Sequence, residues 1–132
     1  MKVLVDTNVI LDVWLAREPF WRDSAKLIGR IEERKVEGYV CPTTITTLHY
    51  LGKKVLGEKK ARKLLGQLLE LFQVGEIRSD EFVFALKSKV KDYEDAVIEA
   101  VGVREKVDVI ATRDVDDFKN SQVPSLEPSQ LI

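Results

Sequence analysis

Aspartate side chains stand beside three apolar stretches of this sequence, where they could together form a metal site. They are Asp6 after KVLV, Asp92 and Asp95 in DYEDAV, and Asp114, Asp116 and Asp117 in ATRDVDDF. Clustered carboxylates repel one another, so their convergence requires a cation. Hard oxygen ligands favour Mg²⁺ or Mn²⁺. Such an ion can generate hydroxide from water and stabilise the oxygens of a phosphodiester during displacement.

Each aspartate also has a purely structural interpretation. Asp6 is a favoured residue type for the N-cap of a helix that follows the first strand. Asp92 could cap a later helix, with Asp95 three residues on in an arrangement that resembles a capping box. Asp116 and Asp117 could lie in a solvent-exposed loop. A metal site is favoured because all three groups fall at junctions of the same polarity between predicted elements.

The elements that would position these acids alternate between strands and helices. We predict strands at 2–5, 38–42, 73–77 and 107–112, and a last short strand followed by a turn within 123–132. We predict helices at 8–16, 20–34, 43–57, 58–72, 79–88 and 92–106. The expected caps are Thr43 or Thr44 for the third helix and Ser79 for the fifth. Because parallel strands need long crossovers, this alternation predicts an α/β fold with a parallel sheet covered by helices on both faces.

The bulk composition limits the class of protein. The chain has 132 residues, of which 45% are hydrophobic and 33% charged, so we expect one globular domain over residues 1–132. The net charge of −1 means that a nucleic acid could bind only at a local basic patch. A single cysteine, Cys41, excludes an internal disulfide and fits a reducing compartment. Without an apolar stretch near the roughly 20 residues that cross a membrane, we expect a cytoplasmic protein.

One basic segment and one aromatic group could form binding surfaces. The segment KKVLGEKKARK contains Lys53, Lys54, Lys59, Lys60, Arg62 and Lys63. It is the best candidate in the sequence for contacts to the phosphates of a nucleic acid, although a solvated helix face would show the same pattern. Trp14, Phe20 and Trp21 are expected either to pack in the core or to form a dimer contact. We expect a homodimer.

Three stretches taken together resemble the PIN-domain ribonucleases. They are VDTNVILDV, DYEDAVIEA and VIATRDVDDF, in this order and at these spacings. The resemblance spans nearly the whole chain, and the family includes the toxin subunits of bacterial and archaeal toxin–antitoxin pairs. It implies a three-layer α/β/α domain with a central parallel sheet of about five short strands. It also implies cleavage of single-stranded RNA with Mg²⁺ or Mn²⁺ and an antitoxin protein as a partner.

The resemblance also implies roles for individual residues. Asp6, Asp95 and Asp114 match the acids that hold the ion. Asp117, which precedes Phe118, matches a further catalytic acid in a branch of the family with a longer loop. The small polar residues that would orient ligands or waters are Thr7, Asn8 and Thr112.

One expected acid is absent from the sequence. The family usually has a glutamate in the helix after the second strand, but here that region reads PTTITTLHYLGKK. Thr46, Thr47 or His49 occupies the neighbourhood instead, so the chain resembles a branch that lacks this acid. A neutral His49 could bind the ion or a water on it. Alternatively, His49 packs beside Tyr50 with its ring nitrogens satisfied.

The sequence therefore predicts a metal-dependent endoribonuclease that acts as the toxin of a toxin–antitoxin pair. The alternative is a catalytically weakened module that binds RNA or a protein partner without cleavage, because one carboxylate is missing. A third class, another Mg²⁺-dependent phosphohydrolase on a doubly wound sheet, is disfavoured. The sequence has neither a glycine-rich loop that could hold a phosphate nor a D-x-D motif after the first strand.

Overall fold

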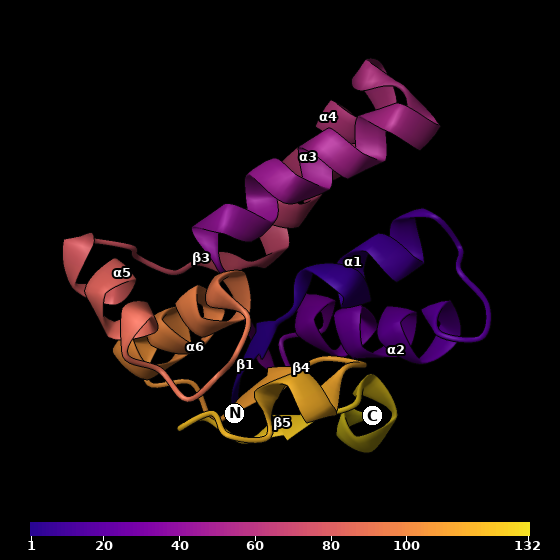
Figure 1. The fold of residues 1–132 in the computed structure, drawn as a ribbon. Coiled ribbons are helices and arrows are strands. Elements are labelled where there is room, and N and C mark those ends of the chain that lie inside the picture. Colours follow the sequence, from indigo (N-terminus) through magenta and orange to yellow (C-terminus); the bar gives the residue numbers. More distant parts are fainter.

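The computed structural model describes residues 1–132. A five-stranded parallel sheet forms the centre of the molecule, with helices on both faces (Figure 1). The strands are β1 (Lys2–Val5), β2 (Glu37–Val40), β3 (Gln73–Val74), β4 (Val109–Ala111) and β5 (Ser125–Leu126). Their order across the sheet is β3-β2-β1-β4-β5, and every neighbouring pair is parallel. The predicted three-layer α/β/α architecture is confirmed.

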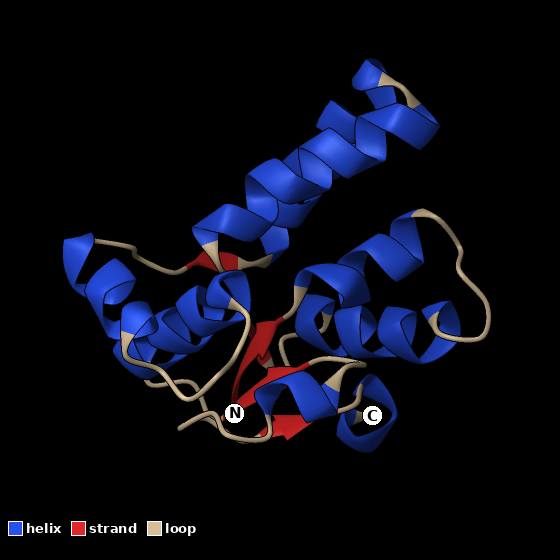
Figure 2. Cartoon of the chain, in the orientation of Figure 1, coloured by secondary structure: helices blue, strands red, loops and turns tan.

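All six predicted helices are present, each within two residues of its expected bounds (Figure 2). They are α1 (Thr7–Trp14), α2 (Trp21–Glu32), α3 (Pro42–Leu56), α4 (Glu58–Leu71), α5 (Ser79–Leu86) and α6 (Tyr93–Glu105). Two short 3₁₀ helices follow, η1 (Val115–Phe118) and η2 (Pro128–Leu131). None of these helices is both long and apolar enough to cross a membrane.

The strand predicted at 73–77 is shorter than expected. β3 ends at Val74, and Gly75 then donates a last backbone hydrogen bond to the carbonyl of Val40 at 2.9 Å. At Gly75 the chain passes so close to α6 that a Cβ atom would lie 2.4 Å from the Val101 side chain. The close approach of α6 therefore requires glycine where the sequence pattern predicted continued pairing.

The predicted cap of α3 is wrong. The helix begins at Pro42, and Cys41 rather than Thr43 or Thr44 is the N-cap residue. Proline suits the first helical position because the N–H that it lacks would have no helical partner there. Both threonines lie inside the first turn, where the Thr44 N–H donates to the Cys41 carbonyl at 3.0 Å. Because Thr44 is not the cap residue, its side chain does not cap the helix and is instead buried in the interior.

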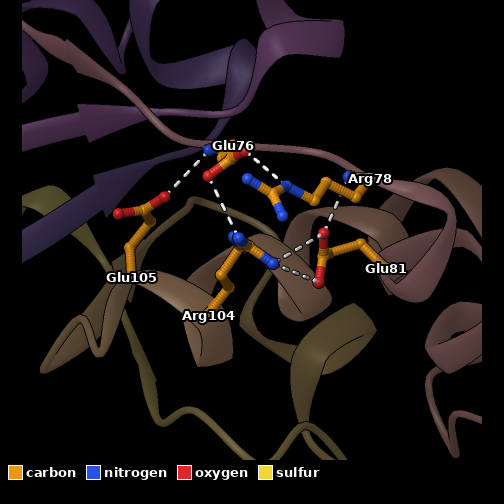
Figure 3. A network of polar contacts seen from close by, with 5 residues as sticks. All are labelled: Glu76, Arg78, Glu81, Arg104 and Glu105. Atoms are coloured by element: carbon orange, nitrogen blue, oxygen red, sulfur yellow. Dashed lines mark hydrogen bonds and ion pairs between the residues drawn. The ribbon is translucent and has the colours of Figure 1, made fainter.

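A network of charged residues joins α5 to α6 (Figure 3). Arg104 of α6 forms ion pairs with Glu76 at 3.0 Å and with Glu81 of α5 at 3.3 Å. The N-cap of α5 is Arg78 and not the predicted Ser79. The Arg78 N–H donates to the Glu81 carboxylate at 2.7 Å. These contacts hold the two helices together and so place the loop that connects them.

The two faces of the sheet carry separate hydrophobic cores. Val3, Val5 and Val109 pack against α1, α2, α3 and α4 on one face. Leu4 and Ile110 pack against α5 and α6 on the other. The alternation follows from the pleat of a strand, which sends successive side chains to opposite faces. These residues lie in the strands predicted at 2–5 and 107–112, which pair with each other in the sheet.

The sheet has a topological switch point between β1 and β4, because the chain adds β2 and β3 on one side of β1 and then β4 and β5 on the other. β1 pairs with β2 on one side and with β4 on the other, and the chain reaches β4 only after building the β2–β3 half of the sheet. At the carboxyl end of this pair the Asp6 N–H donates to the Ala111 carbonyl at 2.9 Å. Crevices at such switch points are the usual place for ligands in open parallel sheets.

Candidate active site

Asp6 lies at the carboxyl end of β1 and is buried. It is the N-cap residue of α1, and its Oδ1 accepts a hydrogen bond from the Thr7 N–H at 2.8 Å. Its Oδ2 accepts one from the Thr112 hydroxyl at 2.8 Å. Burial raises the pKa of Asp6 in spite of these two hydrogen bonds. Asp6 therefore does cap the helix, and because a carboxylate has about four lone-pair directions, the cap leaves capacity for a further ligand.

The loop after β4 is tied to this carboxylate. Thr112, which is fully buried, donates to Asp6 and accepts a hydrogen bond from the Asp114 N–H at 3.0 Å. The Asp114 carboxylate accepts a hydrogen bond from the Asn8 side chain at 3.1 Å. Residues 106 positions apart in the sequence thus hold Asp6 and Asp114 at one edge of the sheet.

Asp95 reaches the same region from the start of α6. The preceding Asp92 is the N-cap of that helix, and its carboxylate accepts the Asp95 N–H at 3.0 Å, which confirms the capping interpretation of Asp92. The pKa of Asp95 is raised to about 7, first by burial and then by the negative charges of Asp6, Asp92, Asp117 and Glu94. Four carboxylates, from the end of β1, the start of α6 and η1, therefore act on one half-buried acid.

A hollow of about 250 Å³ opens beside Asp95. Its lining contains no hydrophobic side chain and consists of Lys89, Lys91, Asp92, Asp95, Asp116, Asp117, Lys119 and Asn120. Asp116 and Asp117 lie in η1 and are exposed, as one interpretation of the sequence predicted. Asp6 and Asp114 are not among the lining residues, although the charge of Asp6 acts on Asp95.

The chemistry of these donors fits a hard divalent cation, because all are oxygen ligands and their mutual repulsion raises the pKa of Asp95. The spacing is loose, however. No group of three or more histidine, cysteine, aspartate or glutamate side chains is close enough to hold one ion. The residues therefore fit an ion that keeps several of its waters, as Mg²⁺ usually does.

Glu94 was not singled out from the sequence. Its negative charge raises the pKa of both Asp6 and Asp95, although it is exposed in the first turn of α6. The sequence signal was present in the two adjacent acids of DYEDAV. Only the packing of α6 against the β1–β4 edge shows that the first of them also acts on Asp6.

Asp12 was also missed. Its side chain is 1% exposed and lies 3.2 Å from Arg113 and 3.5 Å from Arg17. Burial raises the pKa of Asp12 even though both arginines act to lower it. The available signal was an acid between Leu11 and Val13, within an otherwise apolar helix. Arg113 precedes Asp114, so this buried acid supports the loop that carries a candidate ligand.

The region of the missing acid contains threonines and a paired histidine. The Nε2 atom of His49 lies 2.9 Å from the carboxylate of Glu58 at the start of α4, so this ring nitrogen has a hydrogen-bond partner. At the beginning of α3 the fully buried Thr44 places its hydroxyl 2.8 Å from the hydroxyl of Thr7. One ring nitrogen of His49 therefore has a structural partner, as the second interpretation expected, and that partner is Glu58.

The predicted basic patch lies on the hairpin of α3 and α4, which extends away from the sheet in Figure 1. Its members are Lys53, Lys54, Lys59, Lys60, Arg62 and Lys63. Arg62 pairs with Glu58 at 2.6 Å, and the Lys54 ammonium lies 4.0 Å from the centre of the Tyr50 ring. None of the six lines the hollow beside Asp95. Their contact with RNA stays a prediction.

The aromatic residues singled out in the sequence have different surroundings. Trp14 packs against the core between β1 and the helices, where a Cβ atom at Gly52 would lie 3.1 Å from its ring. Phe20 is partly exposed and stacks beneath the guanidinium of Arg113 at 4.3 Å. Core packing thus accounts for Trp14.

Comparison with known proteins identifies the family of this chain. A family model of the PIN domain matches residues 2–116, and the chain belongs to the PIN domain family. No curated protein matches the sequence. The match covers β1 with Asp6, the start of α6 with Asp95, and the loop that contains Asp114.

Several solved structures have a similar fold. A toxin–antitoxin complex from Klebsiella pneumoniae has 22% identity and a TM-score of 0.70, over 96% of this chain and 97% of that chain. VapBC2 from Rickettsia felis, bound to a promoter DNA fragment, has 11% identity and a TM-score of 0.72, over 96% and 98%. VapC20 from Mycobacterium tuberculosis, a Sarcin-Ricin loop cleaving toxin, has 13% identity and a TM-score of 0.71, over 89% and 93%. At these identities the similarity establishes the fold.

Proposed function

We propose that this chain is a metal-dependent endoribonuclease that cleaves single-stranded RNA in the cytoplasm. The observation that carries the proposal is the raised pKa of Asp95. Burial and neighbouring carboxylates, which include Asp6 and Asp117, raise it to about 7. A divalent cation would relieve this repulsion, and perturbed acids in a hollow are typical of catalytic sites. Membership of the PIN domain family supports the same conclusion.

We further propose that the chain is the toxin of a toxin–antitoxin pair and forms a homodimer. The similar folds include VapBC2 of Rickettsia felis and a toxin–antitoxin complex from Klebsiella pneumoniae. The VapC20 toxin of Mycobacterium tuberculosis is described as a Sarcin-Ricin loop cleaving toxin. These descriptions support an RNA substrate and an antitoxin partner for the present chain.

Asp6, Asp95 and Asp114 would hold Mg²⁺ or Mn²⁺, in part through waters that the ion keeps, and Asp117 would add a further carboxylate from the rim of the hollow. When bound, the ion would lower the pKa of a water molecule and stabilise negative charge on the phosphodiester oxygens. The chain's own residues orient the ligands. The Thr7 N–H and the Thr112 hydroxyl fix both oxygens of Asp6, and polar neighbours of this kind commonly tune metal affinity.

The test is cleavage of a labelled single-stranded RNA by the purified chain with Mn²⁺. We expect Asp6→Asn to reduce the rate at least about a hundredfold, because it removes one charge from the ion's ligands. Glu70→Gln on the exposed face of α4 is the matched control and should cleave like the unmodified chain. Cleavage that survives Asp6→Asn unchanged would refute the assignment.

A binding module without catalysis is the second candidate. It is favoured by one observation, namely that no group of three acids is close enough to hold an ion directly. Calorimetric titration with Mg²⁺ and Mn²⁺ separates the two candidates. Absence of binding at millimolar metal, together with intact RNA binding, would favour the module.

A further inference from the structure

We propose that a groove along the loop between α5 and α6 binds the phosphate backbone of the RNA substrate through Lys89, Lys91 and Lys119. This inference rests on the proposed function and identifies how its substrate is held. The groove lies beside the candidate acids and is distinct from the basic patch of the α3–α4 hairpin.

Two neighbouring hollows make up this groove. The first, of about 250 Å³, contains Asp95 and Asp117. The second, of about 330 Å³, is lined by Phe84, Lys87, Ser88, Lys89, Glu99, Asn120 and Gln122. Lys89 and Asn120 line both hollows, so the two lie side by side along the surface next to the acids. A chain molecule bound at the acids would therefore have a path along the surface.

The lysines of the groove are available for a ligand. Lys89, Lys91 and Lys119 are exposed, and none of them forms an ion pair, although Lys91 is followed directly by Asp92. Four aspartates line the first hollow and would repel a phosphodiester chain. Ammonium groups on the same rim offset this repulsion at the flanking phosphates.

One buried carboxylate holds both walls of the groove. Glu99 of α6 is 1% exposed and accepts hydrogen bonds from the Ser88 hydroxyl and from the Gln122 N–H, the latter at 2.6 Å. The Ser88 hydroxyl also accepts the N–H of Val90 at 3.0 Å. Glu99 thus ties the loop that carries Lys89 to the segment that follows Lys119, and the lysine backbones need little ordering when RNA binds.

The second hollow also offers a surface for a base. Phe84 is its one hydrophobic lining residue and is partly exposed. Aromatic rings beside a basic track are typical of single-strand binding, because any base can stack on them. Lysines and an aromatic ring together fit single-stranded RNA, because it presents phosphates to the lysines and bases to the ring along the same chain.

The hairpin patch is the competing surface for RNA. It carries more cations, but Arg62 is paired with Glu58, and Lys54 lies over the Tyr50 ring. The hairpin extends away from the sheet edge that carries Asp6 (Figure 1). RNA bound only at its tip would not be brought to the acids.

The experiment measures binding of a fluorescent twelve-nucleotide uridine RNA to the full chain in EDTA, at several salt concentrations. The groove variant is K89Q/K91Q/K119Q, and the competing variant is K53Q/K59Q/K60Q. The matched control K26Q/K35Q/K106Q removes the same charge from α2 and from turns at the opposite edge of the sheet. Each lost contact to single-stranded RNA should reduce the slope of log affinity against log salt by about 0.7.

For the groove variant, we expect the magnitude of this slope to fall by about two. Its affinity at low salt should fall at least tenfold, and the control should keep both its slope and its affinity. The single variants K89Q and K119Q, on opposite walls, should each lose a part of that effect. An unchanged groove variant, or a loss confined to the hairpin variant, would overturn the inference. So would the absence of any RNA binding.

Cleavage with Mn²⁺ is measured in parallel so that the two proposals can fail separately. A chain that cleaves RNA while the groove variant keeps its affinity retains the proposed function and loses the groove. A chain that binds RNA through the three lysines but does not cleave it supports the groove and argues for the binding module.

Discussion

Asp12 of α1 and Arg113 of the loop after β4 form an ion pair, with 3.2 Å between Oδ2 and Nε. Arg113 also stacks over the ring of Phe20 at 4.3 Å. Because Arg113 adjoins Asp114, which in turn accepts a hydrogen bond from Asn8, the loop is fastened to α1 at two successive residues. The candidate ligand Asp114 is therefore held by the first helix as well as by β4.

Arg113→Gln should lower the free energy of unfolding by about 2 kcal/mol. The change leaves the buried Asp12 carboxylate without its nearer arginine, and breaking a buried pair costs several kcal/mol when both charges are buried. The Arg113 side chain is 26% exposed, which lets water offset part of that cost. Urea denaturation measures the change, with Glu70→Gln as the control. An unchanged midpoint for Arg113→Gln would show that the pair does not stabilise the fold.

Thr112→Val should weaken both the fold and metal binding. The variant keeps the shape of the side chain but removes a hydroxyl that donates to Asp6 and accepts from the Asp114 N–H. Loss of a buried hydrogen-bond partner costs about 1–3 kcal/mol. Loss of such a supporting contact typically reduces metal affinity about 10- to 100-fold.

Thr112→Ser is the matched control because it retains the hydroxyl. Urea denaturation and Mn²⁺ titration of the two variants separate the hydroxyl from side-chain volume. Equal losses in both variants would mean that the methyl group, and not the hydrogen bonds of Thr112, is what matters.

Asp95→Asn should stabilise the metal-free chain at alkaline pH. The folded-state pKa of Asp95, about 7, lies above its ordinary value of 3.8, so the folded chain binds this proton more tightly than the unfolded chain does. The free energy of unfolding should therefore fall as pH rises from about 4 to about 7 and change no further above that range on account of this residue.

The variant removes this dependence, so its advantage should grow from near zero at about pH 4 to on the order of 2 kcal/mol at about pH 8. One pH unit corresponds to about 1.4 kcal/mol, and water reaching the half-buried site screens roughly half of the effect. Urea denaturation at several pH values measures it. In excess Mn²⁺ the order should reverse, because a bound ion stabilises only the chain that holds it. A pH-independent difference in EDTA would contradict the prediction.

Glu94→Gln should lower the pKa of Asp95, because it removes one of the negative charges that raise it. Glu94 is the smallest of the contributors that raise this pKa, and at its exposed position water screens its charge. Carbon-detected NMR titration of the Asp95 carboxyl measures the change, with Glu70→Gln as the control. A pKa that does not move would show that Glu94 is too far away to act on the site.

The helices were largely predictable because their signals are local. The apolar spacing in the fourth helix and the acids of DYEDAV mark elements whose observed bounds differ by at most one residue from those expected. The caps at Thr43 and Ser79 were not predictable in the same way. Several adjacent polar residues suit a helix start, and the choice of Cys41 and Arg78 depends on how the chain leaves the sheet.

For the acids too, local sequence predicted some features and not others. The sequence by itself determined that Asp6 and Asp114 follow strands and that Asp95 begins a helix, because these positions depend on hydrophobic patterning within a few residues. It did not reveal the pairing of Asp12 with Arg113, or that of Glu99 with the Gln122 N–H, because those partners lie far apart in the chain.

Only the tertiary structure decided which charges act on one another. The parallel pairing of β1 with β4 brings Asp6 to Thr112, and the packing of α6 brings Asp95 within reach of the charge of Asp6. It also placed Lys89 and Lys119 around one groove, whereas the basic run near Lys59 lies on a separate hairpin. The physical reason is that electrostatic and hydrogen-bonding energies depend on distance in space, which a linear order of residues does not contain.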